Sequence, residues 1–178
     1  TVESATPLYA TFALWRCPPS PLDAPPDDSG PRPGALSRWL SGSRTARPLQ
    51  RRQLYVMGFD LDHPPFRSPI RDSIEANKAR LRVPNRVLLN AESHPDFGWQ
   101  VRDRYRDWEL EDTAVEVVGG FDMLRGFAAD STVLCSDGDF VRICGYGSRE
   151  TINLGLLKVE PGAVDATVAA LRETLPGD

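Results

Sequence analysis

Four stretches of the chain carry the apolar and aromatic residues that are typical of β-strands. They are residues 7–16 (PLYATFALWR), 54–61 (LYVMGFDL), 86–90 (RVLLN) and 153–159 (NLGLLKV). The second stretch is apolar almost without interruption, which predicts a strand covered on both faces. Polar and apolar residues alternate through residues 108–121 (WELEDTAVEVVGGF), which predicts a hairpin with its turn near Glu111 and Asp112.

Two further stretches have the period of amphipathic helices. Residues 68–84 predict one helix, with Ser68 as its cap and Pro69 at the first helical position. The second helix follows the last strand, where Pro161 can begin a helix without losing a hydrogen bond. Its apolar stripe consists of Val164, Val168, Leu171 and Leu175, and the pair Pro176-Gly177 ends it.

Residues 131–147 (STVLCSDGDFVRICGYG) fit two local structures. The pair Asp137-Gly138 is typical of a two-residue hairpin turn. Ser136 followed by Asp139, with Gly145 at the end, equally describes a short capped helix. The local chemistry leaves both structures open.

Residues 18–52 contain about half of the 16 prolines in the chain. Proline fixes φ and removes a hydrogen-bond donor, so this stretch cannot form a central strand or a long helix. We expect a partly disordered surface insertion, in which residues 34–42 (GALSRWLSG) form at most a short helical turn. A partner-binding polyproline segment is the alternative.

Composition and charge narrow the class of protein only slightly. The chain has 178 residues, 40% hydrophobic and 26% charged, which is ordinary for one globular domain or two small subdomains. A net charge of −4 gives no basic footprint for nucleic acid, and no apolar run approaches the roughly 20 residues of a membrane span. The start of the sequence, TVESATPLY, is interpreted as that of an excised or processed piece. Cys17, Cys135 and Cys144 have no zinc-site spacing, and we expect all three to be free thiols.

The candidate chemical groups are few and weakly patterned. Asp60, Asp62 and His63 could ligate a metal, although a polar turn before Pro64 is the favoured interpretation. Ser93-His94 and Ser136 have no nucleophile elbow or recognisable base. The glycines of VVGGF and CGYGS do not match a phosphate-binding loop. We therefore expect no cofactor, no metal site and no enzymatic activity.

Five stretches, taken in order, resemble one family more closely than any of them does alone. They are VESATPLYATFALWRCP, LYVMGFDLDHPPF, PNRVLLNAESHPDFG, VEVVGGFDMLRGFAADSTVLCSDGDFVRI and ETINLGLLKVEPGAVDATVAALRETLPGD. The resemblance is to the extracytoplasmic domain of DevC-type ABC exporter permeases, relatives of the MacB and lipoprotein-release permeases. It covers nearly the whole chain outside the Pro-rich segment, and its specificity lies in the order of the five motifs.

The resemblance implies an α+β fold of the MacB-like periplasmic type, with two subdomains. Residues 1–17 and 152–178 would form a porter-like α/β subdomain, with the last strand and helix as its packing scaffold. Residues 53–151 would form a second, mixed α/β (Sabre-like) subdomain, and residues 18–52 would be the insertion loop. The resemblance also favours the capped helix after Ser136. In members of the family, a brief turn joins the two strands that correspond to residues 7–16 and 54–61 of this chain. The family domain also has a strand and a helix before the VESATPLY motif.

The resemblance further implies a non-catalytic role at the periplasmic side of the inner membrane. The parent permease would be a homodimer that works with a cytoplasmic ATPase subunit. The domain would couple ATP-driven motion to a membrane-fusion protein and, through it, to a TolC-like outer-membrane channel that exports a lipid-like or amphipathic substrate. A lipoprotein-release permease domain and a free-standing extracytoplasmic binding or immunity-type module are the alternatives.

Exposed aromatic residues are the natural candidates for a partner contact, since interface anchors favour aromatics and Arg. The candidates are Trp99, Phe97, Trp39 and Tyr146. For Phe97 the alternative is burial in the core.

Overall fold

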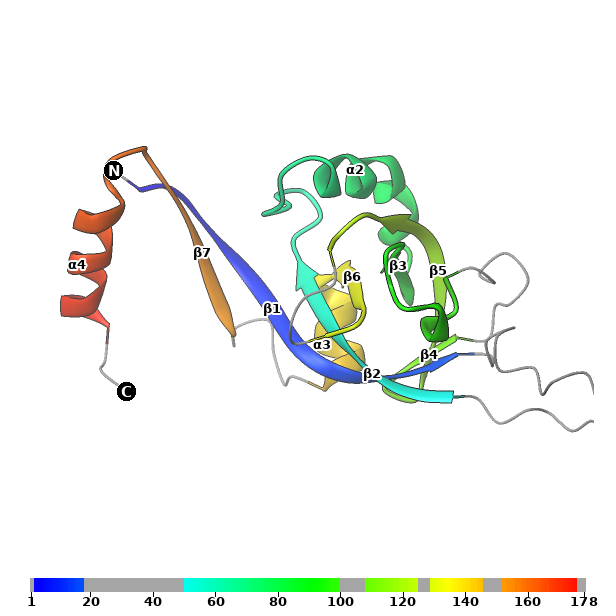
Figure 1. Cartoon of the computed structure of the whole chain (residues 1–178). Coiled ribbons are helices and arrows are strands. Elements are labelled where there is room, and N and C mark those ends of the chain that lie inside the picture. The colour runs from blue at the N-terminus through cyan, green and yellow to red at the C-terminus, as the bar shows by residue number, and fades with distance from the viewer. Residues whose placement is uncertain (1, 18–49, 100–107, 125–128, 146–151, 176–178) are drawn as a thin grey trace, which may run out of the picture.

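The structure, a computed structural model, describes residues 2–17, 50–99, 108–124, 129–145 and 152–175. The strands are β1 (Val2–Cys17), β2 (Gln50–Phe59), β3 (Arg86–Asn90), β4 (Trp108–Leu110), β5 (Thr113–Phe121), β6 (Thr132–Ser136) and β7 (Leu154–Val159). The helices are α2 (Ile70–Leu81), α3 (Asp137–Cys144) and α4 (Val164–Thr174), with a 3-10 turn, η2 (Pro95–Phe97). The expected α+β class is confirmed (Figure 1). No helix in these ranges combines the length and the apolar character that a membrane crossing requires.

Six strands close on themselves through hydrogen bonds. The order of the sheet is β2-β6-β3-β5-β4-β1-β7, and β1 also pairs with β2, which joins the two ends of the first six strands. The pairs β2–β6 and β3–β5 are parallel and the other pairs are antiparallel. The neighbouring β4–β1 pair is short, with Trp15 opposite Leu110 and Arg16 opposite Glu109. We call these six strands the ring, and β7 lies outside it.

Two apolar clusters fill and cover the ring, because successive strand residues point to opposite faces. Val87 and Leu89 of β3 belong to the first cluster, whereas Leu88 between them belongs to the second. The first cluster draws on all six ring strands and on α3, and its centre holds Trp15 stacked on Trp108 at 5.4 Å between ring centroids. The second cluster lies under α2.

Two local structures follow from turn and cap chemistry that the sequence displays. The predicted β4–β5 hairpin is confirmed, with Glu111 at φ 46° and Asp112 at φ 60°, the left-handed pair that a tight two-residue turn requires. The stretch after β6 is the capped helix rather than a hairpin. Ser136 Oγ accepts a hydrogen bond from Asp139 N at 3.1 Å, and Gly145 ends α3 at φ 71°.

Helix α2 begins differently from the prediction. It starts at Ile70 with Pro69 before it, and no side chain caps it. Ser68, the predicted cap, donates instead to the Asp72 carboxylate at 3.0 Å. The proposed cap is therefore wrong, because an acidic residue in the first turn competes successfully for the hydroxyl.

The Pro-rich segment joins two strands that are hydrogen-bonded neighbours. Cys17 and Gln50 are register partners at the open end of the β1–β2 ladder, so the expectation that the flanking strands lie close together is confirmed. Strand β2 already begins at Gln50, which corrects the predicted loop boundary at residue 52. Residues 18–49, including the helical turn expected near Trp39, lie outside the described residues.

Strand β1 belongs to two parts of the molecule. Val2 to Leu8 pair with β7, while Leu8 to Cys17 pair with β2. Residues 1–17, which were predicted to lie in the first subdomain, therefore form one strand that also belongs to the ring. The ring includes the second half of β1, since Trp15 and Cys17 are fully buried in its core.

The last strand and helix form, with the start of β1, a projection that we call the terminal arm (residues 2–7, β7 and α4; Figure 1). Pro161 and Gly162 make a turn, and α4 begins later than expected, at Val164. Within the described residues α4 has no buried side chain, and the role of this segment as packing scaffold stays a prediction.

Candidate functional site

The two described aromatic candidates, Phe97 and Trp99, are two residues apart in the sequence but differ in exposure. Phe97 ends η2 with 3% of its surface exposed, and its carbonyl accepts a hydrogen bond from the Trp15 indole at 3.3 Å. Phe97 is therefore a core residue, as the alternative held, and not an exposed anchor. Trp99 is partly buried, with its ring against β5, where a Cβ added to Gly120 would lie 2.2 Å from Trp99 Cη2. Trp39 and Tyr146 lie outside the described residues.

A polar hollow of about 500 Å³ lies beside Phe97. Its lining residues come from the start of β2, from η2 and from the approach to β6: Arg51, Arg52, Gln53, His94, Asp96, Phe97 and Asp130. Asp96 is the centre of its electrostatics, because Arg52 Nη2 lies 2.7 Å and His94 Nδ1 3.2 Å from the same carboxylate oxygen. The hollow therefore carries both signs of charge.

The loops around the hollow are fixed by a buried polar cluster at the end of β3. Asn90 donates to Met123 O at 2.7 Å and accepts from Met123 N at 3.1 Å. Ser93 Oγ lies 2.5 Å from Asn90 O and 2.7 Å from Ser131 Oγ. Asn90, Ser93 and Ser131 are each at most 5% exposed. Buried polar groups that satisfy one another hold the backbone in one arrangement.

These contacts decide what Ser93 and His94 can do chemically. The Ser93 hydroxyl is directed to Asn90 and Ser131, whereas the His94 ring is directed to Asp96. Nucleophilic catalysis needs a hydroxyl and a base within hydrogen-bond reach of each other. The two side chains instead serve separate structural contacts, and His94 Nδ1 lies 3.4 Å from Asp96 N as the acceptor that begins η2.

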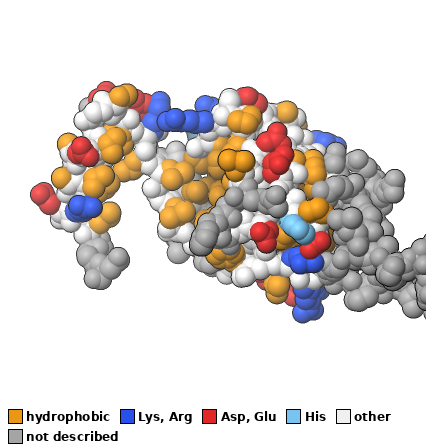
Figure 2. All heavy atoms as spheres, in the orientation of Figure 1, with side chains coloured by type: hydrophobic (Ala, Val, Ile, Leu, Met, Phe, Trp, Pro, Cys, Tyr) orange, Lys and Arg blue, Asp and Glu red, His pale blue; other side chains and the backbone are white. Residues whose placement is uncertain are grey.

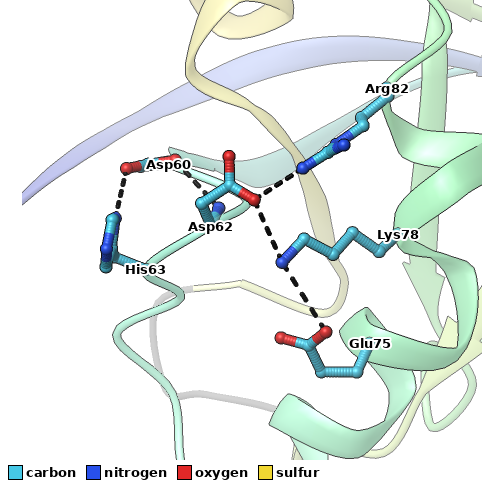
Figure 3. A network of polar contacts seen from close by, with 6 residues as sticks. All are labelled: Asp60, Asp62, His63, Glu75, Lys78 and Arg82. Atoms are coloured by element: carbon cyan, nitrogen blue, oxygen red, sulfur yellow. Dashed lines mark hydrogen bonds and ion pairs between the residues drawn. The ribbon is translucent and has the colours of Figure 1, made fainter.

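The acidic motif after β2 forms a polar network with α2, shown in Figure 3. Asp60 accepts hydrogen bonds from His63 at 2.8 Å and from Asp62 N at 2.9 Å. Asp62 points the other way, toward Lys78 at 3.1 Å and Arg82 at 2.6 Å (Figure 3). The two carboxylates therefore do not converge on one point, and the described residues contain no group of three or more potential ligands placed to hold a metal ion. The favoured interpretation, a polar turn, describes this geometry.

The same contacts set the acidity of the two carboxyls. The hydrogen bond from His63 lowers the pKa of Asp60 below its usual value. Hydrogen bonds from Lys78 and then Arg82 lower the pKa of Asp62. Both side chains are ionised well below neutral pH, and the Asp62 ion pairs tie the loop after β2 to α2.

All three cysteines are free, as predicted. Cys17 Sγ donates to Asp96 O at 3.0 Å and Cys135 Sγ to Met57 O at 3.7 Å. Burial raises the pKa of the Cys135 thiol well above its usual value and that of Cys144 to about 12. Both thiols are therefore protonated at neutral pH, which makes them poor nucleophiles.

The terminal arm carries most of the exposed apolar surface of the described residues. Eight of the twelve exposed large hydrophobic residues belong to it or lie within two residues of β7 or α4: Val2, Ile152, Leu154, Leu156, Leu157, Val164, Val168 and Leu175. Figure 2 shows hydrophobic side chains on this projection among polar and charged ones.

The hollow could not be predicted from the sequence, because no local motif marks it. Arg52, Asp96 and Asp130 are far apart in the chain and meet only when β2, η2 and β6 assemble. In comparisons with known proteins, the chain matches no family model and no curated protein. The resemblance to DevC-type permeases accordingly rests on the order of the five sequence stretches.

Proposed function

We propose that the chain is a non-catalytic extracytoplasmic domain of a DevC-type ABC exporter permease, which couples ATP-driven motion of its parent to a membrane-fusion protein. The observation that carries the proposal is the terminal arm. The start of β1 and the end of α4 lie at the same end of the molecule, away from the ring (Figure 1). A domain inserted between two membrane-spanning segments needs both of its ends on one side.

The division of the molecule also supports this assignment. In the proposal the ring with α2 and α3 is the second, Sabre-like subdomain, and the terminal arm is the porter-like part. The arm would face the membrane and the ring would face the membrane-fusion protein and, through it, the TolC-like channel. The parent would be a homodimer in the inner membrane, served by a cytoplasmic ATPase subunit.

The proposed contact for the membrane-fusion protein is the rim formed by Trp99 and the polar hollow. Trp99 is a partly buried aromatic residue, and Arg51 and Asp130 line the hollow beside the Arg52–Asp96 ion pair. Interfaces commonly combine an aromatic anchor with a polar rim. Trp39 and Tyr146 remain candidates by sequence alone.

The location is tested in the full-length gene product in intact cells. We expect roughly 20 predominantly apolar residues on each side of the chain in that gene product. Leu124 is 88% exposed, so Leu124→Cys introduces an accessible thiol, whereas native Cys17 and Cys135 are buried. A membrane-impermeant maleimide should label this variant when only the outer membrane has been permeabilised, and the unsubstituted protein is the control.

The partner is tested by co-purification of the full-length permease with the membrane-fusion protein encoded beside it. We expect Trp99→Ala to weaken this association while leaving the maleimide labelling unchanged. A thiol protected until the inner membrane is lysed would overturn the proposal. If the thiol is labelled but the gene product lacks apolar segments on either side of the chain, the free-standing extracytoplasmic module is favoured. If the thiol is labelled and no membrane-fusion protein co-purifies, the lipoprotein-release permease is favoured.

A further inference from the structure

We propose that the polar hollow binds a short extended peptide segment, which adds as a further strand to the edge of β2 and carries one acidic and one basic side chain. Three features of the hollow carry this assignment: the backbone edge of β2, two charged side chains and the volume. The source of the segment, the membrane-fusion protein, rests on the proposed function.

The start of β2 projects beyond its neighbour β6. The two strands pair in parallel from Tyr55, which lies opposite Thr132, and Tyr55 N donates to Ser131 O at 3.1 Å. On its other side, β2 pairs with β1 from Gln50 onwards. Within the described residues, no strand therefore pairs with the β6 side of residues 50–54.

The backbone at this edge points toward the hollow. In a strand, the N–H and C=O groups of successive residues point alternately to its two sides. Because Tyr55 directs its N–H toward β6, Gln53 and Arg51 direct theirs to the same side, and both residues line the hollow. An edge of this kind is a template for a further strand, and extended peptides bind proteins by adding to such edges.

The first charge available to a ligand is Arg51. It lies directly opposite Arg16 in the ladder with β1, an unfavourable arrangement of like charges. Arg16 is held by Glu109 at 2.8 Å and by Asp112 at 2.6 Å. Arg51 forms no ion pair in the part of the chain that the structure describes, so an acidic group of a ligand can bind it.

The second charge is Asp130, at the end of the hollow nearer to β6. Its carbonyl accepts a hydrogen bond from His94 N at 3.3 Å, while its side chain forms no ion pair among the described residues. The other charges of the hollow are already matched, since Arg52 lies 2.7 Å from Asp96. A ligand that places an acid at Arg51 and a base at Asp130 therefore complements both open charges.

The ligand that fits these features is a few residues of extended chain. Side chains two residues apart in a strand point to the same face, roughly 6.6 Å from each other. A peptide with an acid and a base in these positions presents both charges on one face, while its backbone can pair with β2. The hollow of about 500 Å³ is within the usual size of small-ligand sites, and it is too small for a folded domain.

Binding is measured by isothermal titration calorimetry with the 178-residue chain. The probes are acetyl-Thr-Glu-Val-Lys-Thr-amide and acetyl-Thr-Lys-Val-Glu-Thr-amide, which cover both strand directions. We expect at least one of them to bind, about tenfold more tightly than the matched peptide in which Gln replaces Glu and Lys. N-methylation removes a peptide N–H, so it should weaken binding at alternate residues only, those whose N–H faces β2.

A charge reversal tests the position of the ligand. Asp130→Lys should weaken binding of the better peptide about tenfold and favour a peptide with Glu at both charged positions. Asp165→Lys in α4 is the matched control, because it makes the same change of charge at an exposed residue of the terminal arm, and it should leave both affinities unchanged. Circular dichroism confirms that both variants keep the fold, which is expected because both side chains are exposed.

The proposal is overturned if neither peptide binds, or if binding is insensitive to Asp130→Lys or to the position of the N-methyl group. Free glycine that competes as well as the peptide would also overturn it, in favour of a site for small zwitterions. Binding that appears only after residues 18–49 have been replaced by a linker would overturn it too, because the occupant would then belong to this chain. A chain that binds the peptide but is not accessible outside the inner membrane would refute the proposed function alone.

Discussion

At the scale of single residues, a helix and a strand of the ring approach each other closely at Gly58 of β2. A Cβ placed there would lie 2.3 Å from Phe140 Cβ, well inside van der Waals contact. Phe140 is fully buried, and its Cβ is too near the backbone to move without α3. Gly58 thus allows α3 to lie directly on β2, which brings Phe140 within 5.6 Å of Tyr9 between ring centroids.

We predict that Gly58→Ala destabilises the fold by roughly 1–3 kcal/mol, because overpacking a rigid core costs about that much. The matched control is Gly155→Ala in β7, where an added Cβ would have no neighbour within 4 Å. That control should change stability by no more than about 0.5 kcal/mol. Urea denaturation followed by tryptophan fluorescence measures both free energies of unfolding, and equal values would contradict the packing described here.

At the scale of elements, two serines that the sequence presents in the same way behave differently. Ser136 caps α3 through Asp139 N, whereas Ser68 donates to the Asp72 side chain and leaves α2 without a side-chain cap. The helix N-terminus has unpaired N–H groups, so a hydroxyl that accepts from them contributes directly to stability. The distinction predicts unequal effects of the same substitution.

Ser136→Ala should lower the free energy of unfolding by about 1 kcal/mol, the usual cost of a lost cap. Ser68→Ala removes only an exposed hydrogen bond between side chains and should cost a few tenths of a kcal/mol at most. Chemical denaturation of the two variants gives the comparison. A larger loss of unfolding free energy for Ser68→Ala than for Ser136→Ala would contradict the assignment of Ser136, and not Ser68, as a helix cap.

Elements governed by local chemistry could be predicted, and contacts between distant elements could not. The hairpin turn at Glu111 and Asp112 depends on neighbouring residues and is present in the sequence pattern, whereas the residues after β6 fitted a hairpin as well as the capped helix that forms. In the ring, β1 pairs with β4 at Trp15 and Leu110, and no local sequence pattern predicts this pairing. The hollow likewise requires Arg52 to meet Asp96, and the exposure of α4 depends on what packs against it and not on its own amphipathic sequence.

At the scale of the whole molecule, the Pro-rich segment is an insertion at the open end of one ladder. Replacing residues 18–49 with a short Gly-Ser linker should leave the fold intact, since Cys17 and Gln50 are already register partners. Each halving of the loop length lowers the entropic cost of bringing the loop ends together by about 0.6 kcal/mol. The free energy of unfolding should therefore be unchanged or raised by up to roughly 2 kcal/mol. Far-UV circular dichroism and urea denaturation test this. Loss of cooperative unfolding would show that the segment belongs to the core.

The continuity of β1 links the terminal arm directly to the ring. Its 16 residues, at about 3.3 Å each, follow a curved path of roughly 50 Å from one to the other (Figure 1). A force along β1 loads the ladder with β2 in shear, so its ten register pairs resist together and do not open one by one. Near the end of β1, the Trp15 indole donates a hydrogen bond to Phe97 O and the Cys17 thiol donates one to Asp96 O. A force applied at the arm is thereby delivered to the rim of the hollow.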